Sequence, residues 1–168
     1  MRVLVTGGSG FLGTNLVGHY AAQGAQVLNL DLLPPRNAEQ GTYWMRCDLR
    51  DAADLASKVR AFSPTLVLHM GARTDLLGTS VADYSANTGG VRNLIEAVAG
   101  MEGMERIIFA SSRLVCRIGY QPEDDADYCP TTAYGESKVE GELLIRELAF
   151  RLPCPWCIVR PTSIWGPD

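Results

Sequence analysis

The sequence predicts an α/β domain built on a doubly wound parallel sheet, and two observations support this fold class. Apolar strands and helices alternate along the whole chain, and a glycine-rich turn follows the first strand. Strands that are separated by helices pair in parallel through right-handed crossovers, which bury both faces of the sheet. With the glycine-rich turn first, the expected strand order is 3-2-1-4-5-6, with a ligand across the carboxyl ends.

The predicted elements rest on hydrophobic patterns and on the residues at their ends. Asp51, with Asp54 three residues on, is typical of a helix start, and Pro64 follows the same helix as a stop. Thr131 or Thr132 can cap the last helix. The expected strands lie near residues 2–6, 26–31, 42–47, 65–70, 105–110 and 155–160, and the expected helices near residues 10–23, 51–62, 80–101 and 132–150.

The first strand runs directly into the turn Thr6-Gly7-Gly8-Ser9-Gly10-Phe11-Leu12-Gly13. Gly7 permits a tight turn with positive φ, and Gly10 removes a side chain where the backbone must approach a phosphate. Gly13 lets the following helix lie close against the sheet. This helix directs its unpaired N–H groups and its positive dipole end at an anion. The turn therefore predicts a Rossmann-type site for the pyrophosphate of a dinucleotide.

The second strand ends on an acid, Asp31, at the place where a dinucleotide site needs one. A carboxylate about 20 residues after the glycines accepts hydrogen bonds from the two hydroxyls of the adenosine ribose. Asp31 would also repel a 2′-phosphate, so it favours NAD over NADP, although Arg36 lies close enough in sequence to weaken that preference. A solvated acid at a strand end is the alternative interpretation of Asp31.

Size, charge and composition exclude several functional classes. The 168 residues form one predicted domain, 1–168, and a net charge of −4 argues against nucleic acid as a partner. We expect no membrane span, because no apolar run approaches the necessary length. Met1 is followed almost at once by a core strand, so we expect no signal peptide and a cytoplasmic location.

Metal and thiol chemistry are not expected. The five cysteines do not suggest a disulfide scaffold, and the pair Cys154 and Cys157 precedes a strand, where no helix dipole lowers a thiol pKa. The acidic run from Glu123 to Asp127 lacks the glycine and the terminal glutamate of a calcium loop. We interpret it as a solvated turn.

A second constellation, Tyr134-Gly135-Glu136-Ser137-Lys138, lies at the start of the last predicted helix. Residues i and i+4 share one face of a helix, so the phenol of Tyr134 and the ammonium of Lys138 lie together. A neighbouring cation lowers the pKa of a phenol and makes it a better base at neutral pH. Ser112, at the end of the fifth strand, can hold a substrate oxygen while Tyr134 exchanges its proton. Taken alone, the pattern would fit an ordinary surface tyrosine–lysine pair.

These stretches together resemble an extended short-chain dehydrogenase/reductase of the NAD-dependent epimerase/dehydratase family, and the likeness covers the whole chain. The sequence departs from the family at Cys116, where a tyrosine is usual, and Arg113 is unusual beside the serine. Because of Cys116, we expect the wall that faces the substrate to differ from that of the family, while the hydride chemistry is unaffected. The matching stretches are Thr6 to Gly13, Asp48-Leu49, His69-Met70-Gly71-Ala72, Ser111-Ser112, Tyr134 with Lys138, and Arg160-Pro161.

The resemblance implies roles for individual residues. Ser112 would orient the substrate oxygen, Tyr134 would be the general acid/base, and Lys138 would hold the nicotinamide ribose of NAD. Asn87 matches a family position near the cofactor, with helix packing as an open alternative. The implied contacts to NAD are Gly7, Gly10, Phe11, Leu12, Gly13, Asp31, Asp48, Leu49, Met70, Gly71, Ala72, Asn87, Tyr134, Lys138, Pro161 and Ser163.

The resemblance also implies a reaction, in which a hydride leaves a carbon that bears a hydroxyl while Tyr134 takes the hydroxyl proton. Such a step begins epimerase and dehydratase reactions on a small-molecule substrate, here a nucleotide sugar. A hydroxysteroid-type or other small-alcohol dehydrogenase is one alternative. A non-catalytic dinucleotide-binding module is another, and the intact residues Ser112, Tyr134 and Lys138 argue against it.

The resemblance leads us to expect more chain than these residues contain. The sequence stops at Asp168, where the family continues with a further strand and a smaller substrate lobe, so we expect a fragment that binds NAD and turns over poorly. A homodimer through the helices near 80–101 and 132–150 is also expected. Apolar residues of the last helix could equally face the sheet: Val139, Leu143, Leu144 and Leu148.

Overall fold

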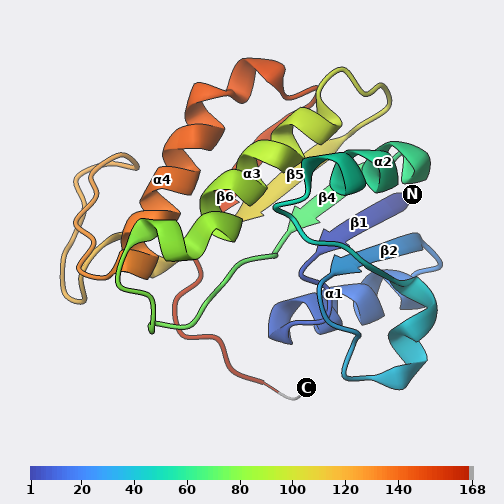
Figure 1. Ribbon diagram of the computed structural model, residues 1–168, viewed down its shortest axis with the longest axis horizontal. Coiled ribbons are helices and arrows are strands. Elements are labelled where there is room, and N and C mark those ends of the chain that lie inside the picture. Colours follow the sequence, from blue (N-terminus) through green and yellow to red (C-terminus); the bar gives the residue numbers. More distant parts are fainter. Residues whose placement is uncertain (167–168) are drawn as a thin grey trace.

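A single sheet of six parallel strands runs through the computed structural model, which describes residues 1–166 (Figure 1). The strand order is β3-β2-β1-β4-β5-β6, which confirms the predicted order. Leu4 in the central strand β1 lies beside Leu28 in β2 and Val67 in β4. The strands are β1 Arg2–Thr6, β2 Gln26–Asp31, β3 Trp44–Arg46, β4 Leu66–His69, β5 Arg106–Ala110 and β6 Trp156–Val159.

Helices cover both faces of the sheet and connect its strands (Figure 1). No helix in the part of the chain that the structure describes is long and apolar enough to cross a membrane. The α-helices are α1 Phe11–Ala22, α2 Ala52–Phe62, α3 Ser85–Val98 and α4 Ala133–Glu147, and short 3₁₀ turns span Ala38–Tyr43, Val81–Tyr84, Arg113–Val115 and Ala149–Arg151.

The larger hydrophobic core lies between the sheet and the helices α2, α3 and α4. Leu4 and Ile107 from the sheet pack there with Leu55 from α2, Leu94 from α3 and Ile145 from α4, and all five are buried. Neighbouring residues of a strand point to opposite faces. The helices α2, α3 and α4 therefore lie on the face to which Leu4 points.

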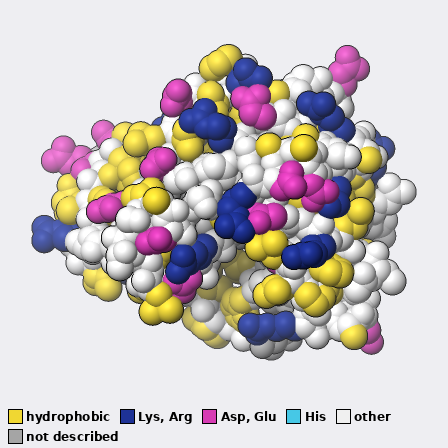
Figure 2. All heavy atoms as spheres, in the orientation of Figure 1, with side chains coloured by type: hydrophobic (Ala, Val, Ile, Leu, Met, Phe, Trp, Pro, Cys, Tyr) yellow, Lys and Arg dark blue, Asp and Glu magenta, His cyan; other side chains and the backbone are white. Residues whose placement is uncertain are grey.

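The smaller core lies on the opposite face, beneath α1. Val3 and Val5 flank Leu4 in β1 and pack with Val17 of α1 and with Leu68 of β4. On the face in Figure 2, which has the orientation of Figure 1, acidic and basic side chains are interspersed and neither sign forms a continuous patch.

The predicted helix ends are also present. Asp51 caps α2, and its carboxylate accepts a hydrogen bond from the backbone N–H of Asp54 at 3.0 Å. Thr132 caps α4 and accepts a hydrogen bond from the N–H of Gly135 at 3.0 Å. Each cap satisfies an N–H group that the helix itself leaves without a partner.

Three predicted elements are shorter than expected. The strand expected at 42–47 is shortened because a 3₁₀ turn occupies its first residues. The helix expected at 80–101 begins with another 3₁₀ turn, since a capping box formed by Ser80 and Asp83 fixes a separate start there. The helix expected at 132–150 ends in a third short turn.

The carboxyl ends of the strands meet at one edge of the sheet, as parallel pairing requires. The N–H of Gly7 extends the pairing of β1 with β2 by donating to the carbonyl of Leu30 at 2.8 Å. The N–H of Ser111 does the same between β5 and β6 by donating to the carbonyl of Val159 at 2.8 Å. The loops that carry the predicted site residues therefore leave the sheet side by side.

Candidate active site

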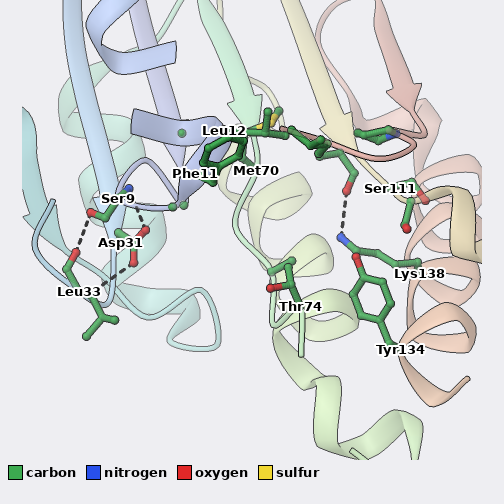
Figure 3. Close-up of a pocket in the computed structure, with 18 of the residues that line it drawn as sticks. Ser9, Phe11, Leu12, Asp31, Leu33, Met70, Thr74, Ser111, Tyr134 and Lys138 are labelled. Carbon is green, nitrogen blue, oxygen red and sulfur yellow. Dashed lines mark hydrogen bonds between the residues drawn. The ribbon is translucent and has the colours of Figure 1, made fainter. Parts of the chain in front are cut away.

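A cavity of about 640 Å³ opens at the carboxyl edge of the sheet. The glycine-rich turn lies on one side of it, and Tyr134 and Lys138 lie on the other (Figure 3). Such an edge is where open α/β sheets bind their ligands. Of the residues predicted from the sequence, those lining this cavity are Gly7, Gly10, Phe11, Leu12, Gly13, Asp31, Met70, Ala72, Ser112, Tyr134, Lys138 and Pro161.

A second cavity of about 330 Å³ adjoins the first, because both share Gly7, Asp31 and Ala72. Three more predicted positions are thereby placed, since Asp48, Leu49 and Gly71 line this second space. The two cavities form a continuous strip of surface along the edge of the sheet.

In the second cavity, the carboxylate of Asp48 is already hydrogen-bonded to Arg50. Its carboxylate accepts hydrogen bonds from the backbone N–H and from Nε of Arg50, both at 2.9 Å. These hydrogen bonds hold the pKa of the Asp48 carboxyl below its ordinary value. Asp48 is therefore an ionised acceptor at the rim.

The glycine-rich turn can adopt its path only because side chains are missing from it. Gly7 has φ of +67°, and a β-carbon on it would lie 2.6 Å from the α-carbon of Gly71. A β-carbon on Gly13 would collide with the carbonyl oxygen of Gly7. Gly10 caps α1 without a side-chain hydrogen bond. The first turn of α1 thus presents backbone N–H groups to the cavity, an arrangement suited to an anion.

Asp31 ties the end of β2 to the glycine-rich turn and faces both cavities. One carboxylate oxygen accepts from the N–H of Ser9 at 3.0 Å, and the other accepts from the N–H of Leu33 at 3.1 Å (Figure 3). Each oxygen has a second lone pair with which it can accept from a hydroxyl. Arg36 lines the same cavity.

At the opposite end of the cavity, α4 carries Tyr134 and Lys138 with only 8% of each exposed. The Lys138 ammonium donates to the carbonyl of Ala110 at 3.0 Å (Figure 3). Burial lowers the pKa of Lys138 to about 8, against the opposing effect of the Glu142 carboxylate. Lys138 is therefore still charged at neutral pH.

The pKa of Tyr134 does not follow the sequence-based expectation. Burial raises the pKa of this phenol above its ordinary value, although the nearby Ser112 hydroxyl acts in the opposite direction. The Lys138 ammonium lies 6.0 Å from the centre of the Tyr134 ring and is turned toward the Ala110 carbonyl. The effect of burial on the Tyr134 pKa is therefore larger than any effect of the Lys138 ammonium, and Tyr134 is a neutral phenol.

Ser112 lies where the sequence predicts it, beside the phenol. It caps the short turn after β5, and its hydroxyl accepts from the N–H of Leu114 at 3.1 Å. The same hydroxyl lies near enough to Tyr134 to act on the pKa of its phenol, and both residues line the cavity. A hydroxyl and a phenol that face one cavity can together hold one oxygen atom of a ligand.

Two predicted residues do not reach a cavity. Asn87 is 1% exposed, and its amide donates to the carbonyl of Arg73 and to Ser137 while its oxygen accepts from the N–H of Arg73. This is the packing role left open above. Ser163 is exposed outside the walls of the cavity, whereas its neighbours Thr162 and Ile164 line it.

Two further residues near the site carry no signal in the sequence. Thr74 lines the cavity across from Tyr134, in the loop that follows β4 (Figure 3). Tyr84 is fully buried, and its ring meets that of Tyr134 edge-on with the centroids 5.9 Å apart. Neither an exposed threonine in a loop nor a tyrosine in a 3₁₀ turn belongs to a recognisable sequence motif. Their positions beside the site are therefore evident only from the folded structure.

Residues 1–166 contain no group of three or more His, Cys, Asp or Glu side chains placed to hold a metal ion. The acidic run is a turn: Asp127 accepts hydrogen bonds from the Tyr120 hydroxyl at 2.8 Å and from the N–H of Glu123 at 2.9 Å.

Comparison with known proteins decides the family. The profile of the NAD dependent epimerase/dehydratase family matches residues 3–168. The chain belongs to this family. The resemblance inferred from the motifs is thereby confirmed.

Relatives within the family differ in the reactions that their names describe. The chain is 30% identical to a 3-beta-hydroxysteroid dehydrogenase of Mycolicibacterium neoaurum, over 98% of this chain and 48% of that protein. It is 31% identical to the N-acetyl-alpha-D-glucosaminyl-diphospho-ditrans,octacis-undecaprenol 4-epimerase of Escherichia coli O157:H7, over 98% of this chain and 49% of that protein.

A solved epimerase shares the fold. The UDP-glucose 4-epimerase of Thermus thermophilus, crystallised with NAD, superimposes with a TM-score of 0.77 at 31% identity and covers 95% of this chain. The match includes 54% of the epimerase chain. The chain described here thus spans about half the length of the curated relatives it matches.

Proposed function

We propose that residues 1–168 are the NAD-binding domain of an epimerase or dehydratase that oxidises a hydroxyl of a nucleotide sugar by hydride transfer to NAD. One observation carries this proposal: Ser112 and Tyr134 line the same cavity as the glycine-rich turn. A dinucleotide that rests on the turn would therefore extend toward an acid/base pair.

The residues present fit NAD. A β-carbon on Gly7 or Gly13 would collide with neighbouring backbone, so the tight turn requires glycine there, and α1 begins without a side-chain cap. This turn would hold the diphosphate, and Asp31 would accept from the adenosine ribose. Lys138 would hold the nicotinamide ribose, with Pro161 over the carboxamide. When bound, NAD supplies the hydride acceptor.

The side chains then divide the proton chemistry between them. Ser112 would orient the substrate oxygen, and Tyr134 would take the hydroxyl proton at its phenol oxygen or return it. The raised pKa of Tyr134 keeps the phenol protonated in the free protein, so it is ready as an acid. To act as a base it needs a positive charge nearby, and Lys138 remains charged below about pH 8.

Relatives favour a sugar diphosphate as substrate, since two of those described above are named as 4-epimerases of such compounds. A second candidate is a hydroxysteroid, which the 30% identity to a 3-beta-hydroxysteroid dehydrogenase favours. Tyr134 and Ser112 would serve either reaction, because both begin with the oxidation of a secondary alcohol.

The chain also supports proposals about assembly and location. In α4, Leu144 and Leu148 are buried toward the core, while Leu143 is 50% exposed on the outside. We expect homodimers through the outer faces of α3 and α4, detectable by sedimentation. All five cysteines are free thiols, which suits the reducing cytoplasm.

The decisive experiment combines calorimetry with NAD and a single-turnover measurement of NADH absorbance. UDP-glucose and a 3β-hydroxysteroid are each offered to the chain, with Tyr134→Phe as the matched control. We expect NAD binding and slow reduction with UDP-glucose alone. Reduction with the steroid alone would favour the second candidate. NAD binding without reduction by either substrate would favour a binding module, and rapid turnover would contradict the expectation of a poorly active fragment.

A further inference from the structure

The buried face of α4 carries a carboxylate that the proposed chemistry does not use. Glu142 is 1% exposed and accepts three hydrogen bonds: from the Tyr128 hydroxyl at 2.9 Å and from Nε and Nη2 of Arg160 at 2.8 and 2.7 Å. Burial alone would raise the pKa of this carboxyl, but these donors bring it below its ordinary value. Glu142 is therefore an ionised group in the interior.

The partners of Glu142 lead to the wall of the cavity. Arg160 immediately precedes Pro161 and Thr162, which line it. The carbonyl of Pro161 accepts from the N–H of Arg113 at 3.1 Å, and Arg113 follows Ser112 in the chain. The Glu142–Arg160 pair thus fixes the distance between α4, which carries Tyr134 and Lys138, and the wall that faces them.

The same pair also holds the loop before α4. Nη2 of Arg160 donates to the carbonyl of Asp125 at 2.6 Å, and its guanidinium lies 5.2 Å from the centre of the Tyr128 ring. Arg146, the other cation near Glu142, lies 4.0 Å from its carboxylate and is more exposed. Three segments of chain therefore meet at one buried carboxylate: α4, the loop that contains Asp125 and Tyr128, and the segment at Arg160.

Glu142 also faces Lys138, one helical turn earlier on α4. Lys138 and Glu142 are the two charged side chains among the buried residues of the described range. The other groups near Lys138 are neutral: Tyr134 of α4, the Ala110 carbonyl of β5, and His69 of β4, whose pKa burial lowers to about 3. The negative charge that favours the Lys138 ammonium comes from Glu142.

We propose that Glu142 is a positioning residue of the active site, which holds the wall at Arg160–Thr162 against α4 and keeps the Lys138 ammonium charged. The inference rests on the proposed function, because it takes Lys138 and that wall to contact NAD. Glu142 itself is not among the residues that line the two cavities. It acts through Lys138 and Arg160.

A titration of Lys138 tests the electrostatic part without any cofactor. The sequence contains two lysines, Lys58 and Lys138, so isotopically labelled lysine gives two side-chain NMR signals, and Lys58 is an internal reference. In Glu142→Gln the titration midpoint of Lys138 should move to lower pH by about half a unit or more, because an opposite charge is lost. Glu140→Gln, at an exposed position of the same helix, should leave it unchanged.

Glu142→Asp separates the charge of the side chain from its reach. The shorter aspartate keeps a negative charge near Lys138 but cannot accept both hydrogen bonds from Arg160 in the same geometry. We expect its Lys138 midpoint to remain near that of the wild type, while NAD affinity falls about tenfold, the loss that follows when one charged hydrogen bond is removed. In Glu142→Gln both the midpoint and the affinity should change.

The results separate this inference from the proposed function. If the wild-type chain binds no NAD while Lys138 still shifts in Glu142→Gln, the proposed function fails and the electrostatic role of Glu142 stands. A Lys138 midpoint that is the same in wild type, Glu142→Gln and Glu140→Gln overturns the inference. Should Glu142→Gln fail to fold, the double variant Glu142→Gln with Arg160→Met removes both charges of the buried pair and is measured in its place, with a shift of the Lys138 midpoint to lower pH again expected.

Discussion

Replacing Lys138 by methionine should stabilise the free protein at neutral pH, although it removes a residue of the proposed active site. Burial lowers the pKa of Lys138 from 10.5 to about 8. At 1.36 kcal/mol per pKa unit, the charged side chain costs the folded state about 3 kcal/mol. Methionine leaves the Ala110 carbonyl without its donor, which costs about 1 kcal/mol. The net expectation is a gain of about 2 kcal/mol in the free energy of unfolding.

The pH dependence of the stability difference between the wild type and Lys138→Met provides a second test of the predicted sign. The folded-state pKa of Lys138 lies below the unfolded value, so the penalty is fully present below pH 8 and is relieved as pH rises from about 8 toward 10.5. Between about pH 7 and pH 9 the wild type should therefore recover about 1 kcal/mol relative to Lys138→Met. Subtracting the variant cancels other titrating groups, such as Cys47, whose pKa burial raises to about 12.

Urea denaturation of both proteins at the two pH values measures these quantities. The matched control is Lys58→Met, since Lys58 pairs with Asp54 at the surface of α2. That change should cost no more than about 1 kcal/mol and should show no comparable pH dependence. A Lys138→Met variant that is less stable than the wild type at neutral pH, or a difference that does not change with pH, would refute the reasoning.

Three other substitutions test the remaining parts of the site. Tyr134→Phe should keep NAD affinity within about threefold, measured by calorimetry, and slow single-turnover hydride transfer by about 10²- to 10⁴-fold, because the proton has no acceptor; equal rates would exclude Tyr134 as the acid/base. Gly13→Ala should abolish NAD binding and cost at least about 2 kcal/mol in urea denaturation, because its β-carbon collides with the Gly7 carbonyl. Its control Gly89→Ala, which meets nothing within 4 Å, should be neutral or stabilising by about 1 kcal/mol. Asp31→Ser should raise the ratio of NADP to NAD affinity at least about tenfold, since a carboxylate repels the 2′-phosphate, and an unchanged ratio would contradict the role of Asp31.

Most of the fold follows from local patterns that the sequence displays openly. Apolar strands between amphipathic helices fix a parallel sheet, and the crossover rule then leaves few possible strand orders. Caps such as Asp51 and Thr132 are visible because a side-chain oxygen must lie at a fixed offset from the first helical turn. The shortened third strand was not visible, since 3₁₀ turns have no distinctive hydrophobic period.

The site was predictable where a single loop or helix turn contains all the parts. The glycine-rich turn and the pair Tyr134 and Lys138 are of this kind. Asn87 shows the limit: its partners lie 14 and 50 residues away, so only the packed structure reveals that its amide is fully engaged. The pKa of Tyr134 likewise depends on how deeply α4 buries the phenol, and no local pattern contains that depth.

The contact between Gly7 and Gly71 has a consequence for how this site can diversify. The backbones of Gly7 and Gly71 are in contact where the loops after the adjacent strands β1 and β4 leave the sheet. Neither position has room for a side chain. The floor beneath a ligand is consequently the same peptide surface whatever the rest of the sequence does. Within residues 1–166, a change of selectivity must therefore come from the loops around the cavity, such as the one that presents Thr74.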